Sequence, residues 1–112
     1  MDILFKTSKL RKTLSSESLL VREFGKENAR VIMRRMVTLD RADCLADIPA
    51  QRPTRRHALS GKRKGQYAID AKHPFRIILE PADDPVPVRE DGSVDLQRVT
   101  SIRIQGVEDY HR

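Results

Sequence analysis

The fold is decided by residues 66–80, which read Gln-Tyr-Ala-Ile-Asp-Ala-Lys-His-Pro-Phe-Arg-Ile-Ile-Leu-Glu. Before a short break at 71–74, Tyr67 and Ile69 alternate with Gln66, Ala68 and Asp70. After the break, Phe75, Ile77 and Leu79 alternate with Arg76 and Ile78. A period of two is the pattern of a β-strand. A break of this length is short enough for a hairpin turn. Residues 66–70 and 75–79 are therefore predicted to be adjacent antiparallel strands.

Two further strands are predicted near the ends of the chain. Residues 3–5 form a short apolar run, Ile-Leu-Phe, which predicts an opening strand. Ile102 and Ile104 alternate with polar neighbours, and Val107 follows a break at Gly106, which predicts a closing strand. Residues 81–95 contain three prolines and an Asp-Gly pair, so they are predicted to be a polar excursion between strands.

Between the opening strand and the hairpin the period becomes helical. Leu10 and Leu14 lie one turn apart in a short predicted helix. From residue 18 to about 43, apolar residues recur at intervals of three and four, and Gly25 is a point where the helix can start afresh. Helices first and strands later predict an α+β fold, with two N-terminal helices packed on a twisted, mostly antiparallel β-sheet. The length predicts a single domain, residues 1–112.

The positive charge is concentrated in the middle of the chain. Lys and Arg minus Asp and Glu give 10 − 7 = +3 for residues 1–48, 8 − 2 = +6 for 49–80 and 4 − 7 = −3 for 81–112. Basic patches attract polyanions, nucleic acid first among them, although a charge run is also compatible with a plain solvated surface. With five aromatic residues and no Trp, a broad base-stacking platform is not expected.

Several classes of protein are disfavoured by what the sequence lacks. Cys44 is the single cysteine, so neither an intramolecular disulfide nor a cysteine-based metal site is expected. No histidine pair has a His-x₃-His spacing, and we expect no metal and no other cofactor. No apolar run approaches the roughly 18–20 residues of a membrane span, and the N-terminal apolar stretch is too short for a signal peptide. We therefore expect a cytoplasmic protein without membrane contact.

Two segments, the basic stretch 55–67 and the C-terminal stretch 107–112, carry groups suited to cleaving RNA. Transesterification needs a base for the 2′-hydroxyl, cations for the phosphorane charge and an acid for the leaving 5′-oxygen. Imidazoles exchange protons near neutral pH, and guanidinium groups pair with phosphate. The predicted catalytic residues in these segments are His57, Asp109, Tyr110 and His111. Arg76, in the predicted strand 75–79, is a further guanidinium that can pair with phosphate and completes the predicted catalytic set. The predicted RNA-binding residues are Arg55, Arg56, Lys62, Arg63 and Lys64.

Simpler readings of some of these residues stay open. Arg76 can be an ion-pair partner of Glu80 or Asp70, and Tyr110 can pack against the sheet. His73 precedes a proline in a turn, so we assign it no chemistry. The sequence also leaves open which histidine or carboxylate is the base and which is the acid.

Four stretches of the chain resemble the RelE/ParE superfamily of bacterial toxin–antitoxin toxins, with the host-inhibition-of-growth (HigB-like) branch as the most similar. They are Phe-Gly-Lys-Glu-Asn-Ala at 24–29, Leu-Ser-Gly-Lys-Arg-Lys-Gly-Gln at 59–66, Lys-His-Pro-Phe-Arg-Ile-Ile at 72–78 and Val-Glu-Asp-Tyr-His at 107–111. The similarity covers nearly the whole chain. It implies a RelE-like fold and a ribosome-dependent endoribonuclease that cleaves mRNA and so inhibits translation and growth.

The resemblance also implies a partner and a set of site residues. A cognate helix-turn-helix antitoxin (HigA-like) is expected to bind and block the toxin in a hetero-oligomer. The family's basic-loop histidine maps onto His57, its strand arginine onto Arg76, and its terminal acid, phenol and imidazole onto Asp109, Tyr110 and His111. Relatives often have Gly-Asp-Arg where this chain has Gly-Lys-Arg at 61–63, which adds positive charge and removes that acid.

Two other functions remain compatible with the resemblance. The ParE branch binds DNA gyrase and cuts nothing, and a degenerate toxin would only bind its antitoxin. The terminal acid, phenol and imidazole favour the endoribonuclease, because an inhibitor that acts by binding needs no proton-transfer groups.

Overall fold

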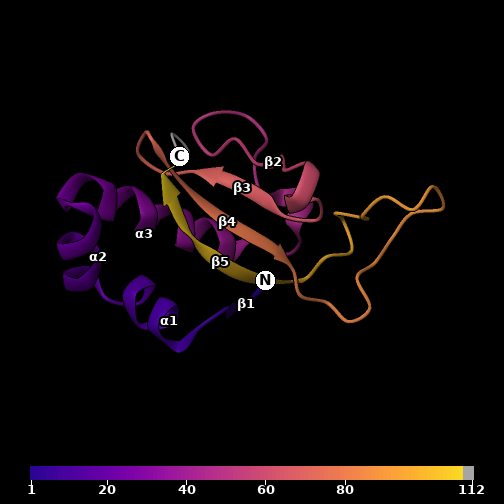
Figure 1. Cartoon of the computed structure of the whole chain (residues 1–112). Coiled ribbons are helices and arrows are strands. Elements are labelled where there is room, and N and C mark those ends of the chain that lie inside the picture. Colours follow the sequence, from indigo (N-terminus) through magenta and orange to yellow (C-terminus); the bar gives the residue numbers. More distant parts are fainter. Residues whose placement is uncertain (110–112) are drawn as a thin grey trace.

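A five-stranded sheet with strand order β1-β5-β4-β3-β2 forms the centre of the computed structural model, which describes residues 1–109 (Figure 1). Its strands are β1 Asp2–Phe5, β2 His57–Ala58, β3 Tyr67–Asp70, β4 Phe75–Pro81 and β5 Ser101–Asp109. β1 pairs in parallel with β5, and the other neighbours pair antiparallel. This confirms the predicted α+β class, the hairpin over residues 66–80 and the mostly antiparallel sheet.

Three helices stand where the sequence predicted two. They are α1 Ser8–Leu14, α2 Glu17–Phe24 and α3 Lys26–Arg41. Thr7 and Ser16 cap the first two, each accepting a backbone N–H bond through its hydroxyl. Gly25 separates α2 from α3 with φ +85°, a left-handed conformation that glycine adopts without steric cost. None of the helices within residues 1–109 is both long and apolar enough to cross a lipid bilayer.

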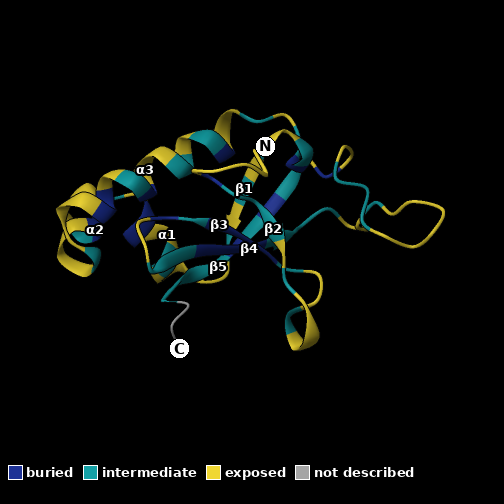
Figure 2. Cartoon of the chain, turned by 90° about the horizontal axis from the view of Figure 1, so that it is seen from above, coloured by how far each residue is buried: buried dark blue, intermediate teal, exposed yellow. Residues whose placement is uncertain are grey.

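The core lies between the helices and one face of the sheet (Figure 2). Phe75, Ile77 and Leu79 of β4 belong to this core cluster, with the last two fully buried. Ile32 of α3 is also fully buried there, and Phe24 of α2 meets Phe75 edge to face with ring centroids 5.6 Å apart. The alternation along β4 therefore sets which side of the sheet the helices cover.

The opposite side of the sheet carries mostly charged side chains. Paired residues of neighbouring strands share a face, so the register gives the membership of this side. We call it the open face and define it by its charged and imidazole side chains, those of His57, Asp70, Arg76, Glu80, Arg103 and Glu108. Ala68 and Ile78 lie on the same side and are fully buried. The register shifts between Ile78 and Leu79, where Gln105 is the extra residue on β5 and donates to the Glu80 carboxylate at 2.8 Å.

The predicted polar excursion joins β4 to β5 and projects from the end of the sheet (Figure 1). It carries its own antiparallel bridge between Val88 and Val94. Its return is fixed because the Asp83 carboxylate accepts from the backbone of Thr100 and Ser101 at 3.0–3.2 Å. The start of β5, and with it the register of the last strand, is held by these bonds.

The packing leads to a stability prediction for β4. Ile77→Ala should lower the free energy of unfolding by about 2–5 kcal/mol, because it removes buried methyl groups and leaves a cavity. Val37→Ala on α3, where the residue is 49% exposed, should stay within about 0.5 kcal/mol of wild type. Urea denaturation followed by circular dichroism measures both values, and equal losses would contradict the assigned core.

Candidate functional site

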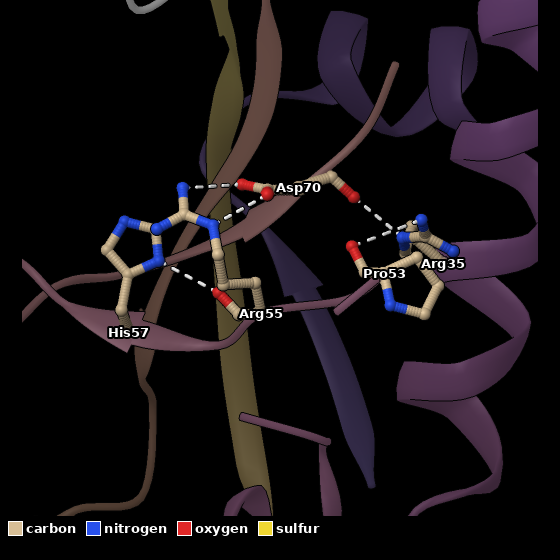
Figure 3. Close-up of polar contacts among 5 residues, drawn as sticks. All are labelled: Arg35, Pro53, Arg55, His57 and Asp70. Carbon is tan, nitrogen blue, oxygen red and sulfur yellow. Dashed lines mark hydrogen bonds and ion pairs between the residues drawn. The ribbon is translucent and has the colours of Figure 1, made fainter. Parts of the chain in front are cut away.

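A bidentate ion pair at the end of β3 fixes the loop that precedes His57 (Figure 3). Arg55 Nε and Nη2 lie 2.7 and 2.9 Å from the two carboxylate oxygens of Asp70. Arg35 of α3 donates from Nε to the Asp70 carbonyl at 2.6 Å and reaches the Pro53 carbonyl at 3.5 Å. Asp70 therefore joins the loop, the sheet and α3 through its side chain and its backbone.

His57 begins β2 and has its imidazole oriented by the same loop. Its Nδ1 lies 2.8 Å from the Arg55 carbonyl oxygen. A carbonyl only accepts, so Nδ1 carries the hydrogen and Nε2 of the neutral ring is the nitrogen that can take up a proton. Arg55 itself has φ +50°, an uncommon conformation for a residue with a side chain, and its pair with Asp70 holds it there.

The structure places the two predicted RNA-binding arginines before His57 in intramolecular contacts. Arg55 pairs with Asp70, and Arg56 donates from Nε to the Ile48 carbonyl at 3.0 Å. These contacts orient His57 and its loop. Contact of either arginine with RNA stays a prediction, as it does for Lys62 and Lys64, which are exposed around the short 3-10 helix Gly61–Arg63 (η2).

Glu108 of β5 is bonded by Arg63 and lies opposite Arg76 in the sheet. The Arg63 guanidinium hydrogen-bonds the Glu108 carboxylate, and Arg76 is its cross-strand partner on β4. The bond to Arg63, and the positive charges of Arg63 and Arg76, hold the pKa of Glu108 below its ordinary value against the effect of burial. The register also pairs Arg76 with Asp70, so a continuous row of charges crosses the open face.

Glu108 is a residue that the motif analysis did not single out. The register pairs Asp109 with Phe75, a residue of the helix-facing core, and pairs Glu108 with Arg76. Within the described part of β5, the carboxylate on the open face is therefore that of Glu108. Alternation along β5 counted from Val107, which packs against the core, gives the same assignment.

The structure brings together part of the predicted catalytic set. His57 on β2 and Arg76 on β4 share the open face, and Asp70 of β3 lies between their strands. Tyr110 and His111 lie outside the described residues. In residues 1–109, no three His, Cys, Asp or Glu side chains are grouped so as to hold a metal ion.

The fold is similar to that of solved YoeB structures. The YoeB–YefM complex from Staphylococcus aureus contains a chain with a TM-score of 0.54 and 13% identity, over 96% of this chain and 94% of that chain. The YoeB dimer from Staphylococcus aureus gives a TM-score of 0.54 and 15% identity over the same shares. No protein-family model matches the sequence, and no curated protein matches it. At these identities the likeness shows a common fold.

The Glu108 contact predicts a pH dependence of stability. A carboxyl whose pKa is depressed in the folded state stabilises the fold above its unfolded pKa, here near 4.5, and loses this contribution as pH falls through the folded pKa. The difference in unfolding free energy between wild type and Glu108→Gln should therefore be largest above pH 4.5 and shrink at lower pH. Urea denaturation across that range measures it, and a difference independent of pH would contradict the ion pair.

Proposed function

We propose that this chain is the toxin of a type II toxin–antitoxin system and cleaves mRNA on the ribosome. The observation that carries the proposal is the open face: an oriented histidine, His57, and two arginines, Arg76 and Arg103, on the side of the sheet opposite the α-helices. The fold supports it, because one of the similar solved structures is that of YoeB in complex with YefM. The +6 charge of residues 49–80 supports a polyanionic substrate.

The proposed chemistry assigns a task to each group of residues. His57 Nε2 exchanges the proton of the attacking or leaving oxygen, and the guanidinium groups of Arg76 and Arg63 stabilise the phosphorane. The roles of Asp109, Tyr110 and His111 rest on the terminal motif. Asp109 would act from the edge of the sheet, because its place opposite Phe75 separates it from the row of charges that contains Arg76.

The proposed partners are mRNA and the ribosome, with a helix-turn-helix antitoxin of the HigA-like kind. A protein with a formal charge of +6 is expected to meet an acidic contact surface on the antitoxin. Both chains would act in the cytoplasm. Co-expression with an antitoxin encoded in the neighbouring reading frame should restore growth and co-purify the two chains.

One translation experiment separates this proposal from its alternatives. The purified chain is added to a translating extract, and the message is analysed by primer extension, with a parallel assay for gyrase-linked DNA breaks. Message cut within codons only when ribosomes carry it supports the endoribonuclease. Intact message together with DNA breaks would instead show an inhibitor of gyrase, and neither effect would leave a chain that only binds its antitoxin.

His57→Ala should slow message cleavage by roughly 10²–10⁴-fold, because a positioned acid or base contributes about that factor. His73→Ala is the matched control, since His73 lies in the turn between β3 and β4, and it should cleave at the wild-type rate. Single-turnover rates on programmed ribosomes measure both. Similar rates for His57→Ala and wild type would remove His57 from the mechanism.

A further inference from the structure

An ion pair joins two segments that are far apart in the sheet order. Arg63 belongs to η2, between β2 and β3, and Glu108 belongs to β5, with β3 and β4 lying between these positions. The Arg63 guanidinium nevertheless hydrogen-bonds the Glu108 carboxylate. Figure 2 shows the segment between β2 and β3 on the side of the sheet away from α3. The two side chains therefore meet over the open face.

A second arginine lies on the neighbouring strand. Arg76 is the cross-strand partner of Glu108, and its positive charge acts on that carboxylate. Glu108 is thus bonded to one arginine and lies in the electrostatic field of another. A carboxylate held in this way has the charge of one phosphodiester and presents oxygens as guanidinium partners, as a phosphodiester does.

The contact is accessible enough to be exchanged. The side chains of Arg63 and Glu108 are 38% and 37% exposed, and ion pairs with this exposure contribute little to stability. The Arg63 guanidinium is therefore within reach of an external anion, which has only to displace a side-chain carboxylate. An RNA strand carries several phosphates at fixed spacing. One phosphate can displace the Glu108 carboxylate while the others bind the surrounding basic residues.

We propose that Glu108 is a built-in competitor of RNA: in the free protein its carboxylate occupies a phosphodiester site formed by Arg63 and Arg76, and an RNA phosphate displaces it on binding. This rests on the proposed function, because it names the ligand of the same face. An RNA strand free in solution must lose translational and conformational entropy on binding, in addition to displacing the carboxylate. A strand already held on the ribosome has less freedom to lose, so the device favours message presented there over free RNA.

The chain supplies a matched control at the next residue. Glu108→Gln and Asp109→Asn each remove one negative charge, but only Glu108 shares the open face with Arg76. The two variants therefore have the same net charge and differ in where the charge is lost. Any general gain in attraction for a polyanion is common to both.

The test is the affinity of each variant for a 2′-O-methyl RNA oligonucleotide, which cannot be cleaved, measured by fluorescence anisotropy over a range of salt concentrations. Glu108→Gln should bind about tenfold more tightly than Asp109→Asn at about 50 mM salt, because one added phosphate contact contributes roughly that factor. Its dependence of log K on log salt should also be steeper by about 0.7. In an Arg63→Gln background the gain should disappear.

Three results would overturn the inference. Equal affinities of the two variants would reduce the effect to net charge, and weaker binding by Glu108→Gln would show that the carboxylate positions Arg63 for RNA. No binding by any variant at low salt would show that the open face takes no RNA phosphate. Circular dichroism confirms that each variant is folded.

Cleavage by the wild-type chain on programmed ribosomes is scored separately. Absence of cleavage with the affinity pattern intact would refute the proposed enzyme and leave the phosphate site standing. Cleavage together with equal RNA affinities of Glu108→Gln and Asp109→Asn would refute the role of Glu108 as a competitor and leave the proposed endoribonuclease standing.

Discussion

The alternation of side chains along β4 is the constraint on which the rest of the structure depends. This strand is paired on both sides, so its register with β3 and β5 fixes two rows of neighbours at once. Phe75, Ile77 and Leu79 pack against the helices. Because side chains alternate along a strand, Arg76 and Glu80 lie on the other face. A slip of one residue would bury charges beneath α3, and burial of unpaired charges is strongly unfavourable.

The open face follows from this constraint, and ion pairs fix the positions of its side chains. Asp70 lies at the end of β3, where it holds Arg55 through its carboxylate and Arg35 through its carbonyl. The orientation of His57 therefore depends on α3 as well as on its own loop. On the other side of Arg76, Glu108 receives Arg63 from η2. The residues proposed to act on RNA are thus held by a connected set of contacts that spans the sheet.

Period and composition predicted much of this arrangement. The hairpin at 66–80 was predictable because apolar and polar residues alternate across a short break. The first short helix and the break after it were predicted. The count of helices was wrong because residues 18–43 were counted as one helix with a possible restart at Gly25, whereas the structure has two, α2 and α3. The partners of Arg55 and Arg63 could not be predicted, since they lie 15 and 45 residues away and depend on the strand order.

At the end of the chain, the motif predicts the residue types, and the strand register determines the face of the sheet on which each residue lies. The motif predicted an acid at Asp109, but the face to which each residue belongs depends on its pairing partner across β4. Once Phe75 is known to face the helices, Asp109 follows it and Glu108 joins Arg76. The β-bulge at Gln105 contributes to this result, because an extra residue in β5 changes the face of everything that follows it.

The central claim, that message lies on the open face, is tested most directly by cross-linking on programmed ribosomes. A photoreactive amino acid is placed at Arg103, on the open face, or at Val37, on the exposed side of α3. Each chain carries His57→Ala, so that the message survives, and cross-linked nucleotides are mapped by reverse transcription. The account predicts cross-links to mRNA from position 103 and none from position 37. Cross-links from position 37 alone would contradict it.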